Sequence, residues 1–194
     1  MSGTNTTIFE ELYSFGQAAT VSVPTASAVT ITAGTPPIEI PGGYFNKLGK
    51  LTSSLHLRLG GLLTATAAVP TWSFGLAYTQ VTPAVFSAST ILCTASTAIT
   101  PTAGTNAQFW MEAHINLRTL AAGAATTLYT QGFVKCPALF PSPFEQSLPP
   151  TGTGNTNAAY DTEVLGFLWP YLTLSAATAT NTVTVEWIKM YGEN

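Results

Sequence analysis

The stretch SLHLRLGGLLTATAAVPTWSFGLAY (Ser54–Tyr78) decides the fold class. Leucine occupies every second position from Leu55 to Leu59, and His56 and Arg58 stand between the leucines. Successive side chains of a β-strand point to opposite faces, so this spacing predicts a strand with one apolar and one polar face. The Gly-Gly pair that follows predicts a bulge or bend, and a proline turn separates this strand from the next.

The rest of the chain repeats this pattern. Ala107–Leu120 alternates in the same way, and a short Gly/Ala turn connects it to a partner strand at Thr126–Cys136. Further β-branched and aromatic runs between turn residues bring the total to about eight to ten strands. Ile8–Gly16 is the one segment with a helical pattern, and an extended conformation is its alternative. The spacing favours an all-β sandwich or barrel.

The expected organisation is one domain with two appendages. Residues 20–194 form the β-domain, residues 1–19 form an extended N-terminal arm, and Pro137–Thr162 forms one long loop. A loop of this length in a compact domain is usually functional. Both appendages carry large apolar side chains, which we expect at contacts with neighbouring subunits. The candidate interface residues are Ile8, Phe9, Leu12, Tyr13, Phe15, Phe140, Phe144 and Leu148.

Charge is scarce in this chain. Charged residues make up 8% of its 194 residues and the formal net charge is −3, whereas an ordinary soluble domain is roughly 25% charged. The basic patch that nucleic-acid binding requires is missing, so no nucleic-acid partner is expected. The sequence also shows neither a signal-peptide pattern nor a membrane-spanning apolar run, and no membrane partner is expected. Cys93 and Cys136 match no metal or redox spacing and are expected to be buried free thiols.

Polar residues gather on one face of the two clearest strands. If these strands are neighbours, His56, Glu112 and His114 can meet as a metal triad or an acid–base group. Cross-strand pairing of Glu112 with Arg58 or Arg118 is the simpler interpretation, and we expect it, with no bound metal and no catalytic role. The residues of this polar strand face are His56, Arg58, Trp110, Glu112, His114 and Arg118.

Signatures of common enzymes are missing. The sequence contains no GxSxG, GxGxxG, P-loop or CxxC motif, and neither histidine has a partner in a triad order. We therefore expect a protein that is not an enzyme and has no cofactor. Among the four tryptophans, Trp110 is the one on a polar face, where an aromatic ring can stack on a sugar.

Several motifs carry a resemblance to a known family. The segments Ile38–Gly132 and the last strand resemble jelly-roll structural proteins of tailed-phage virions, in which an "iPaG…GK" hairpin precedes a "w.le..l.vR..G..ttl.aqG" hairpin. The matching positions are Pro41, Gly43, Gly49, Lys50, Gly60, Pro70, Trp110, Glu112, Arg118, Gly123, Gln131 and Gly132.

This resemblance implies a jelly-roll-like antiparallel β-sandwich with a structural role. Such a protein decorates or cements the capsid of the phage head or is a minor head component, commonly as a homotrimer, and binds the major capsid protein or other virion subunits. It is made in the host cytoplasm and located on the capsid surface of the virion. A surface covered by neighbours also explains the scarcity of charge, because charged residues are depleted at the cores of interfaces. The alternatives are a glycan- or receptor-binding module of a phage fibre and a self-assembling jelly-roll coat protein.

Overall fold

The computed structural model describes residues 9–23, 26–46, 54–66, 70–82, 84–88, 90–119, 126–142, 144–149, 159–176 and 180–193. These residues form thirteen strands and two short 3-10 turns, η1 (Tyr44–Asn46) and η2 (Phe86–Ala88). Neither turn has the length or apolarity needed to cross a lipid bilayer, and the described part of the chain has no longer helix. The strands are β1 (Phe9–Phe15), β2 (Ala19–Ser22), β3 (Val29–Thr30), β4 (Ile38–Ile40), β5 (Ser54–Ala65), β6 (Trp72–Thr79), β7 (Thr90–Thr94), β8 (Gly104–Thr119), β9 (Thr126–Lys135), β10 (Glu145–Leu148), β11 (Ala159–Tyr160), β12 (Gly166–Leu174) and β13 (Thr182–Glu193).

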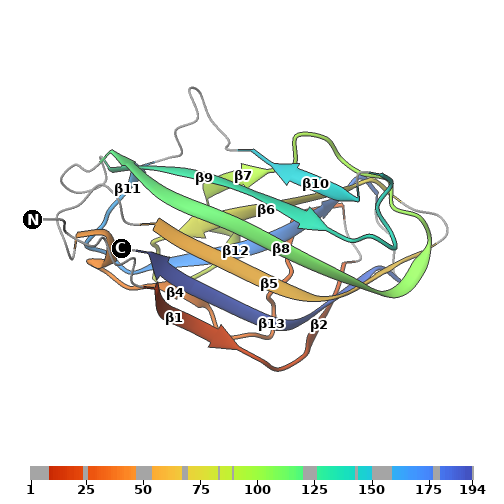
Figure 1. Cartoon of the computed structure of the whole chain (residues 1–194), viewed down its shortest axis with the longest axis horizontal. Coiled ribbons are helices and arrows are strands. Elements are labelled where there is room, and N and C mark those ends of the chain that lie inside the picture. The colour runs from red at the N-terminus through yellow and green to blue at the C-terminus, as the bar shows by residue number, and fades with distance from the viewer. Residues whose placement is uncertain are drawn as a thin grey trace, which may run out of the picture.

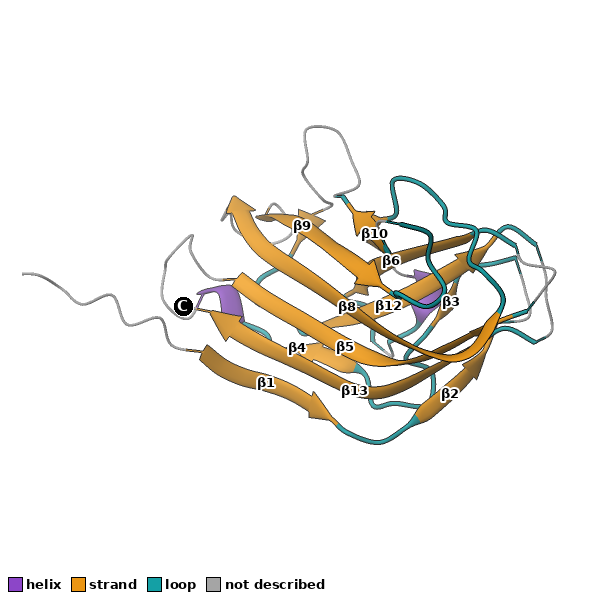
Figure 2. Cartoon of the chain, turned by 45° about the vertical axis from the view of Figure 1, so that its right-hand side comes forward, coloured by secondary structure: helices purple, strands orange, loops and turns teal. Residues whose placement is uncertain are grey.

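The strands form two antiparallel sheets packed face to face (Figures 1 and 2). The large sheet has the order β1-β13-β5-β8-β9-β10, with β2 also beside β13 and β11 beside β9. The small sheet has the order β3-β12-β6-β7, with β4 also beside β12. The predicted all-β sandwich is therefore confirmed.

The connections give the sandwich its jelly-roll-like winding. The chain crosses from the large to the small sheet between β5 and β6, and returns from the small to the large sheet between β12 and β13. β5 pairs with β13 in the large sheet, and β6 pairs with β12 in the small sheet. The antiparallel pair β5/β13 is therefore continued in the other sheet by the antiparallel pair β6/β12, as in a jelly roll.

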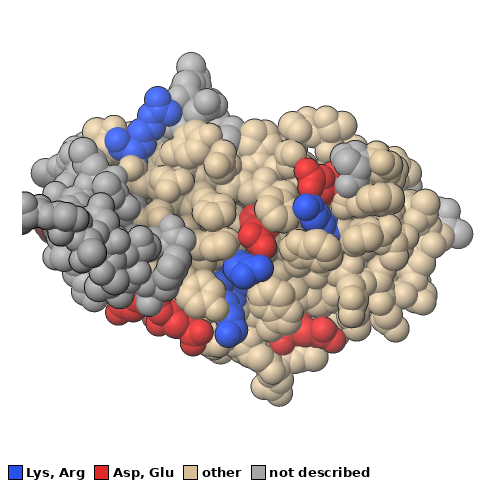
Figure 3. Space-filling view, in the orientation of Figure 1, with Lys and Arg blue, Asp and Glu red and all other residues tan. Residues whose placement is uncertain are grey.

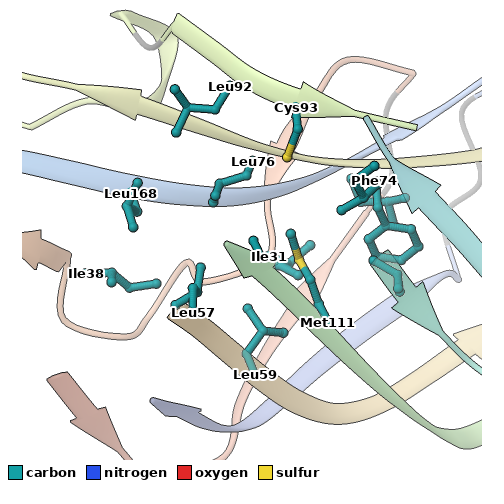
Figure 4. Close-up of a cluster of buried hydrophobic side chains, with 14 of the residues drawn as sticks. Ile31, Ile38, Leu57, Leu59, Phe74, Leu76, Leu92, Cys93, Met111 and Leu168 are labelled. Carbon is teal, nitrogen blue, oxygen red and sulfur yellow. The ribbon is translucent and has the colours of Figure 1, made fainter. Parts of the chain in front are cut away.

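β5 and β8, the two strands that the alternation predicted most clearly, lie at the centre of the large sheet. Leu57 and Met111 point inward and are fully buried, while their neighbours along each strand, such as Arg58 and Glu112, point outward. Side chains from both sheets meet in one core (Figure 4). The labelled core residues are Ile31, Ile38, Leu57, Leu59, Phe74, Leu76, Leu92, Cys93, Met111 and Leu168.

The bulge that the sequence predicts at Gly60-Gly61 lies opposite these glycines, on the neighbouring strand β13. The register of β13 against β5 shifts between Val185 and Trp187, opposite these glycines. A Cβ atom at Gly61 would collide with the carbonyl oxygen of Thr184, and one at Gly60 would lie 2.7 Å from the Trp187 ring. The glycines are required because the bulged strand and its tryptophan approach the β5 backbone closely.

The expected N-terminal arm is corrected by this topology. β1 pairs antiparallel with β13 and forms an edge strand of the large sheet, and Ala19 begins β2. The Tyr13 hydroxyl donates a 2.8 Å hydrogen bond to the carbonyl of Pro36, which holds β1 against the domain. This segment docks on its own sandwich because three of its apolar side chains are half-buried and pack on the core. They are Leu12, Tyr13 and Phe15. Ile8 lies outside the described residues.

The long loop is corrected in part. Pro137–Thr162 contains β10, which pairs with the end of β9, and β11, which pairs with its start. Phe140 and Leu148, expected at an interface, are 3% and 0% exposed and belong to the core. Burial within the chain's own sandwich stabilises these side chains without a partner.

Candidate functional site

A polar cluster lies on the outer face of the large sheet, where β5 and β8 run side by side. His56 stands directly opposite His114, and Arg58 stands directly opposite Glu112. The two imidazole rings are stacked, with centroids 4.1 Å apart and planes inclined by 17°. We call these four residues the histidine cluster.

Glu112 links the cluster through both of its oxygens. Its Oε1 accepts a 3.0 Å hydrogen bond from Arg58 Nη2, and its Oε2 lies 3.3 Å from His56 Nε2. The side chains of His56 and Glu112 are 18% and 19% exposed, whereas that of Arg58 is 47% exposed. The predicted cross-strand pairing of Glu112 with Arg58 is thus present.

The surroundings of His56 favour the neutral form of its ring. Burial lowers the pKa of His56, and the neighbouring His114 lowers it further, while Glu112 acts in the opposite direction. A His56 ring that is neutral near pH 7 presents one nitrogen lone pair. One donor atom from each of His56, Glu112 and His114 lies within 4.8 Å of the other two, so the structure brings the three residues together.

Two hollows flank the histidine cluster. One, of about 430 Å³, lies beside Arg58 and is lined by Trp110 and Trp187. The other, of about 550 Å³, lies beside His114 and is lined by Tyr129 and Phe133. Aromatic walls next to polar side chains are a common feature of ligand-binding surfaces.

Trp187 is a site residue that sequence reasoning missed. Strict alternation from Val183 and Val185 assigns Trp187 to the core. The bulge places Glu186 and Trp187 consecutively on the outer side, and Ile188 resumes the buried positions. The Gly-Gly pair on β5 was the signal for this bulge, but it does not say which strand carries the extra residue.

The remaining polar strand residue lies apart. Arg118 is exposed near the end of β8, four residues beyond His114. In Figure 3 the charged side chains of this side of the molecule form small separate groups on an otherwise uncharged surface. The described part of the chain also has the ion pairs Lys135–Glu145, at 3.1 Å, and Lys189–Glu11, at 3.7 Å, both with partly exposed side chains.

The outer face of the small sheet has a different character. Its strands β3, β6, β7 and β12 contain no Asp, Glu, Lys or Arg; β4 contributes Glu39. The Phe86 ring packs against Trp169 and Tyr171 on this face, beside a hollow of about 540 Å³ that Ile91 also lines. Ile91 is 47% exposed. We call this surface the uncharged face.

Two further candidates can be placed. Phe144, expected at an interface, is 47% exposed and has a left-handed φ of 67°. Cys93 and Cys136 are both buried free thiols, and burial raises the pKa of Cys93 to about 12. A thiol that stays protonated at neutral pH is a poor nucleophile and metal ligand, so Cys93 is a core residue.

Comparisons with known proteins assign no family to this chain. Neither a scan against protein-family models nor a search of curated proteins found a match. Similar solved structures include the CBM2 module of the evolved Dit of Lactobacillus casei BL23 phage J-1, with 10% identity, a TM-score of 0.37, and coverage of 95% of this chain and 96% of that one. A legume lectin-like domain from Entamoeba histolytica has 6% identity and a TM-score of 0.34, covering 95% and 82%.

The metal-free form of lectin I-B4 from Griffonia simplicifolia has 10% identity and a TM-score of 0.34, covering 97% and 94%. At these identities and TM-scores the likenesses support no conclusion about what this chain binds. The chain is a jelly-roll-like β-sandwich protein, and its role has to be argued from its own surfaces.

Proposed function

We propose that this protein is a non-enzymatic structural subunit of a bacteriophage virion, which decorates the capsid as a homotrimer and attaches through its uncharged face. The observation that carries the proposal is the composition of that face. An outward sheet surface whose four main strands carry no Asp, Glu, Lys or Arg has the composition of an interface core.

The energetics support the same conclusion. Covering a charged side chain costs several kcal/mol unless it is paired, whereas covering apolar surface contributes roughly 25 cal/mol per Å². Ile91, which lines the hollow of this face, is 47% exposed in the isolated chain. Val85, next to Phe86, and Val81 are 43% and 52% exposed in the loop between β6 and β7. A neighbouring subunit packed over β3, β6, β7 and β12 would therefore bury apolar surface, and Glu39 on β4 is the one charged side chain on the strands of this sheet.

The test places a charge on the uncharged face. We expect Ile91→Glu and Val85→Glu to reduce binding to undecorated heads, measured by co-sedimentation, at least tenfold. Because both positions are surface positions, we expect the circular dichroism spectrum to stay unchanged. The matched control is Gln108→Glu, which adds the same charge to an exposed position on the other sheet.

Light scattering on the purified chain separates the possible outcomes. A trimer that falls to a monomer in Ile91→Glu supports the proposal. Very large closed particles formed by the chain alone would indicate a self-assembling coat protein instead. Head binding that Ile91→Glu and Val85→Glu leave unchanged would refute attachment through this face.

Glycan binding is the second candidate, and the hollow lined by Trp110 and Trp187 favours it. Tryptophan rings stack on sugar faces, and Arg58, Gln108 and Glu186 beside them supply hydrogen-bonding groups. A glycan array would test it, with Trp110→Ala as the loss variant and Asn116→Ala, farther along the same face of β8, as the control. If the wild type binds no glycan, or if Trp110→Ala binds the same glycans as the wild type, this candidate is ruled out.

A further inference from the structure

We propose that the histidine cluster is a zinc-binding site in which His56, His114 and Glu112 are the ligands. Two imidazole nitrogens and one carboxylate oxygen are a ligand set that Zn²⁺ takes in proteins, with a fourth position left for water. The inference departs from the sequence-based expectation of no metal, which was drawn without the distances between these atoms.

The geometry fits a tetrahedral ion. Bonds of about 2.0–2.2 Å in a tetrahedral site place neighbouring ligand atoms about 3.3–3.6 Å apart. His56 Nε2 and Glu112 Oε2 are already 3.3 Å apart. The donor atoms of all three residues lie within 4.8 Å of one another. Because the two imidazole rings are stacked with planes inclined by 17°, binding one ion requires at least one ring to rotate out of the stack so that both nitrogens point at the metal.

The scaffold holds the ligands in place before the metal arrives. His56 and His114 occupy directly opposed positions of β5 and β8, and both strands have a paired neighbour on their other side, β13 and β9. The side chains of His56 and Glu112 are less than one-fifth exposed. Ligands on rigid, paired strands lose little conformational freedom when they bind an ion.

Arg58 completes the site instead of blocking it. It bonds Glu112 Oε1, while Oε2 is the oxygen that faces His56. One carboxylate can therefore bind the metal through Oε2 and keep its hydrogen bond to Arg58. Such outer hydrogen bonds orient metal ligands, and their loss typically weakens metal affinity about 10–100-fold.

The experiment is a zinc titration of the full chain after treatment with a chelator. The two histidines are the only ones in the sequence, so His56→Gln/His114→Gln has no imidazole left. We expect one zinc ion per chain, at least 100-fold weaker binding in either single histidine variant, and an intermediate loss in Arg58→Gln. Asn116→Ala, on the same face of β8, should bind like the wild type.

Cobalt substitution gives a second readout that does not depend on the variants. Bound Co²⁺ in the wild type should show the intense visible absorption of a four-coordinate ion, and the double variant should lack it. Zinc binding of equal strength in the wild type and the double variant would overturn the proposal. So would the absence of stoichiometric zinc, or a weak six-coordinate cobalt spectrum, in the folded wild type.

Discussion

Gln146 shows at the scale of one residue how the two sheets are joined at an edge. It is 3% exposed on β10 of the large sheet. Its Oε1 accepts a hydrogen bond from Phe74 N, and its Nε2 donates to the carbonyls of Trp72 and Thr97, each at 2.9 Å. A buried amide with these partners connects β10 to β6 across the sandwich.

Replacing this amide by an apolar group should cost stability. In Gln146→Leu the buried N–H of Phe74 loses its acceptor, and we expect unfolding to become easier by about 2–4 kcal/mol. Urea denaturation measures the change. Ser147→Ala, at the exposed neighbouring position, should stay within about 0.5 kcal/mol of the wild type, and an equal effect of the two variants would contradict the argument.

The buried thiol of Cys93 makes a prediction about alkaline pH. Burial raises its pKa from the ordinary value of 9.0 to about 12. Between these values the folded state keeps a proton that the unfolded state has lost, so stability falls as pH rises above about 9. Cys93→Ala should lose less stability than the wild type between about pH 8 and pH 10.5 in urea titrations. Parallel losses would show that Cys93 does not contribute.

At the scale of elements, central strands were easier to predict than edges. β5 and β8 bury one face and expose the other, so apolar and polar residues alternate along them. β1 is an edge strand whose register shifts between Glu11 and Tyr13, which interrupts its alternation. In the edge strand β10 burial alternates, but the buried position 146 holds a glutamine, so the residue types do not show it. Sequence reasoning therefore treated β1 as an arm and β10 as part of a loop.

The edge strand β1 makes a prediction of its own. Deleting residues 1–16 removes the half-buried Leu12, Tyr13 and Phe15, and we expect a loss of about 2–4 kcal/mol with the sandwich still folded. The deletion also exposes the edge of β13, which should increase self-association in light scattering. Glu11→Gln is the control, because its ion pair with Lys189 is exposed and contributes little.

Wild-type stability in the truncated chain would mean that β1 does not dock on β13 in solution. Complete unfolding would mean that β1 is indispensable to the core.

At the scale of the whole molecule, the two outer faces are chemically unlike. The large sheet carries the histidine cluster, two hollows with aromatic walls and separate ion pairs, while the main strands of the small sheet carry no charge. The low charge and the polar strand face could be predicted from the sequence, because both depend only on the types and order of the residues. The distribution of charge between the faces depends on which strands share a sheet, and paired residues such as Thr79 of β6 and Phe167 of β12 are 88 positions apart in the chain.

The uncharged face also sets how fast subunits would assemble. Complementary charges raise association rates toward 10⁸–10⁹ M⁻¹s⁻¹ at low salt, whereas neutral surfaces meet at roughly 10⁵–10⁶ M⁻¹s⁻¹. Strands β3, β6, β7 and β12 offer an approaching partner no long-range attraction, so ionic strength should barely alter the rate. Occupancy of a particle would then follow the concentration of free subunits and the time allowed, and a brief or weak burst of synthesis would leave particles only partly covered.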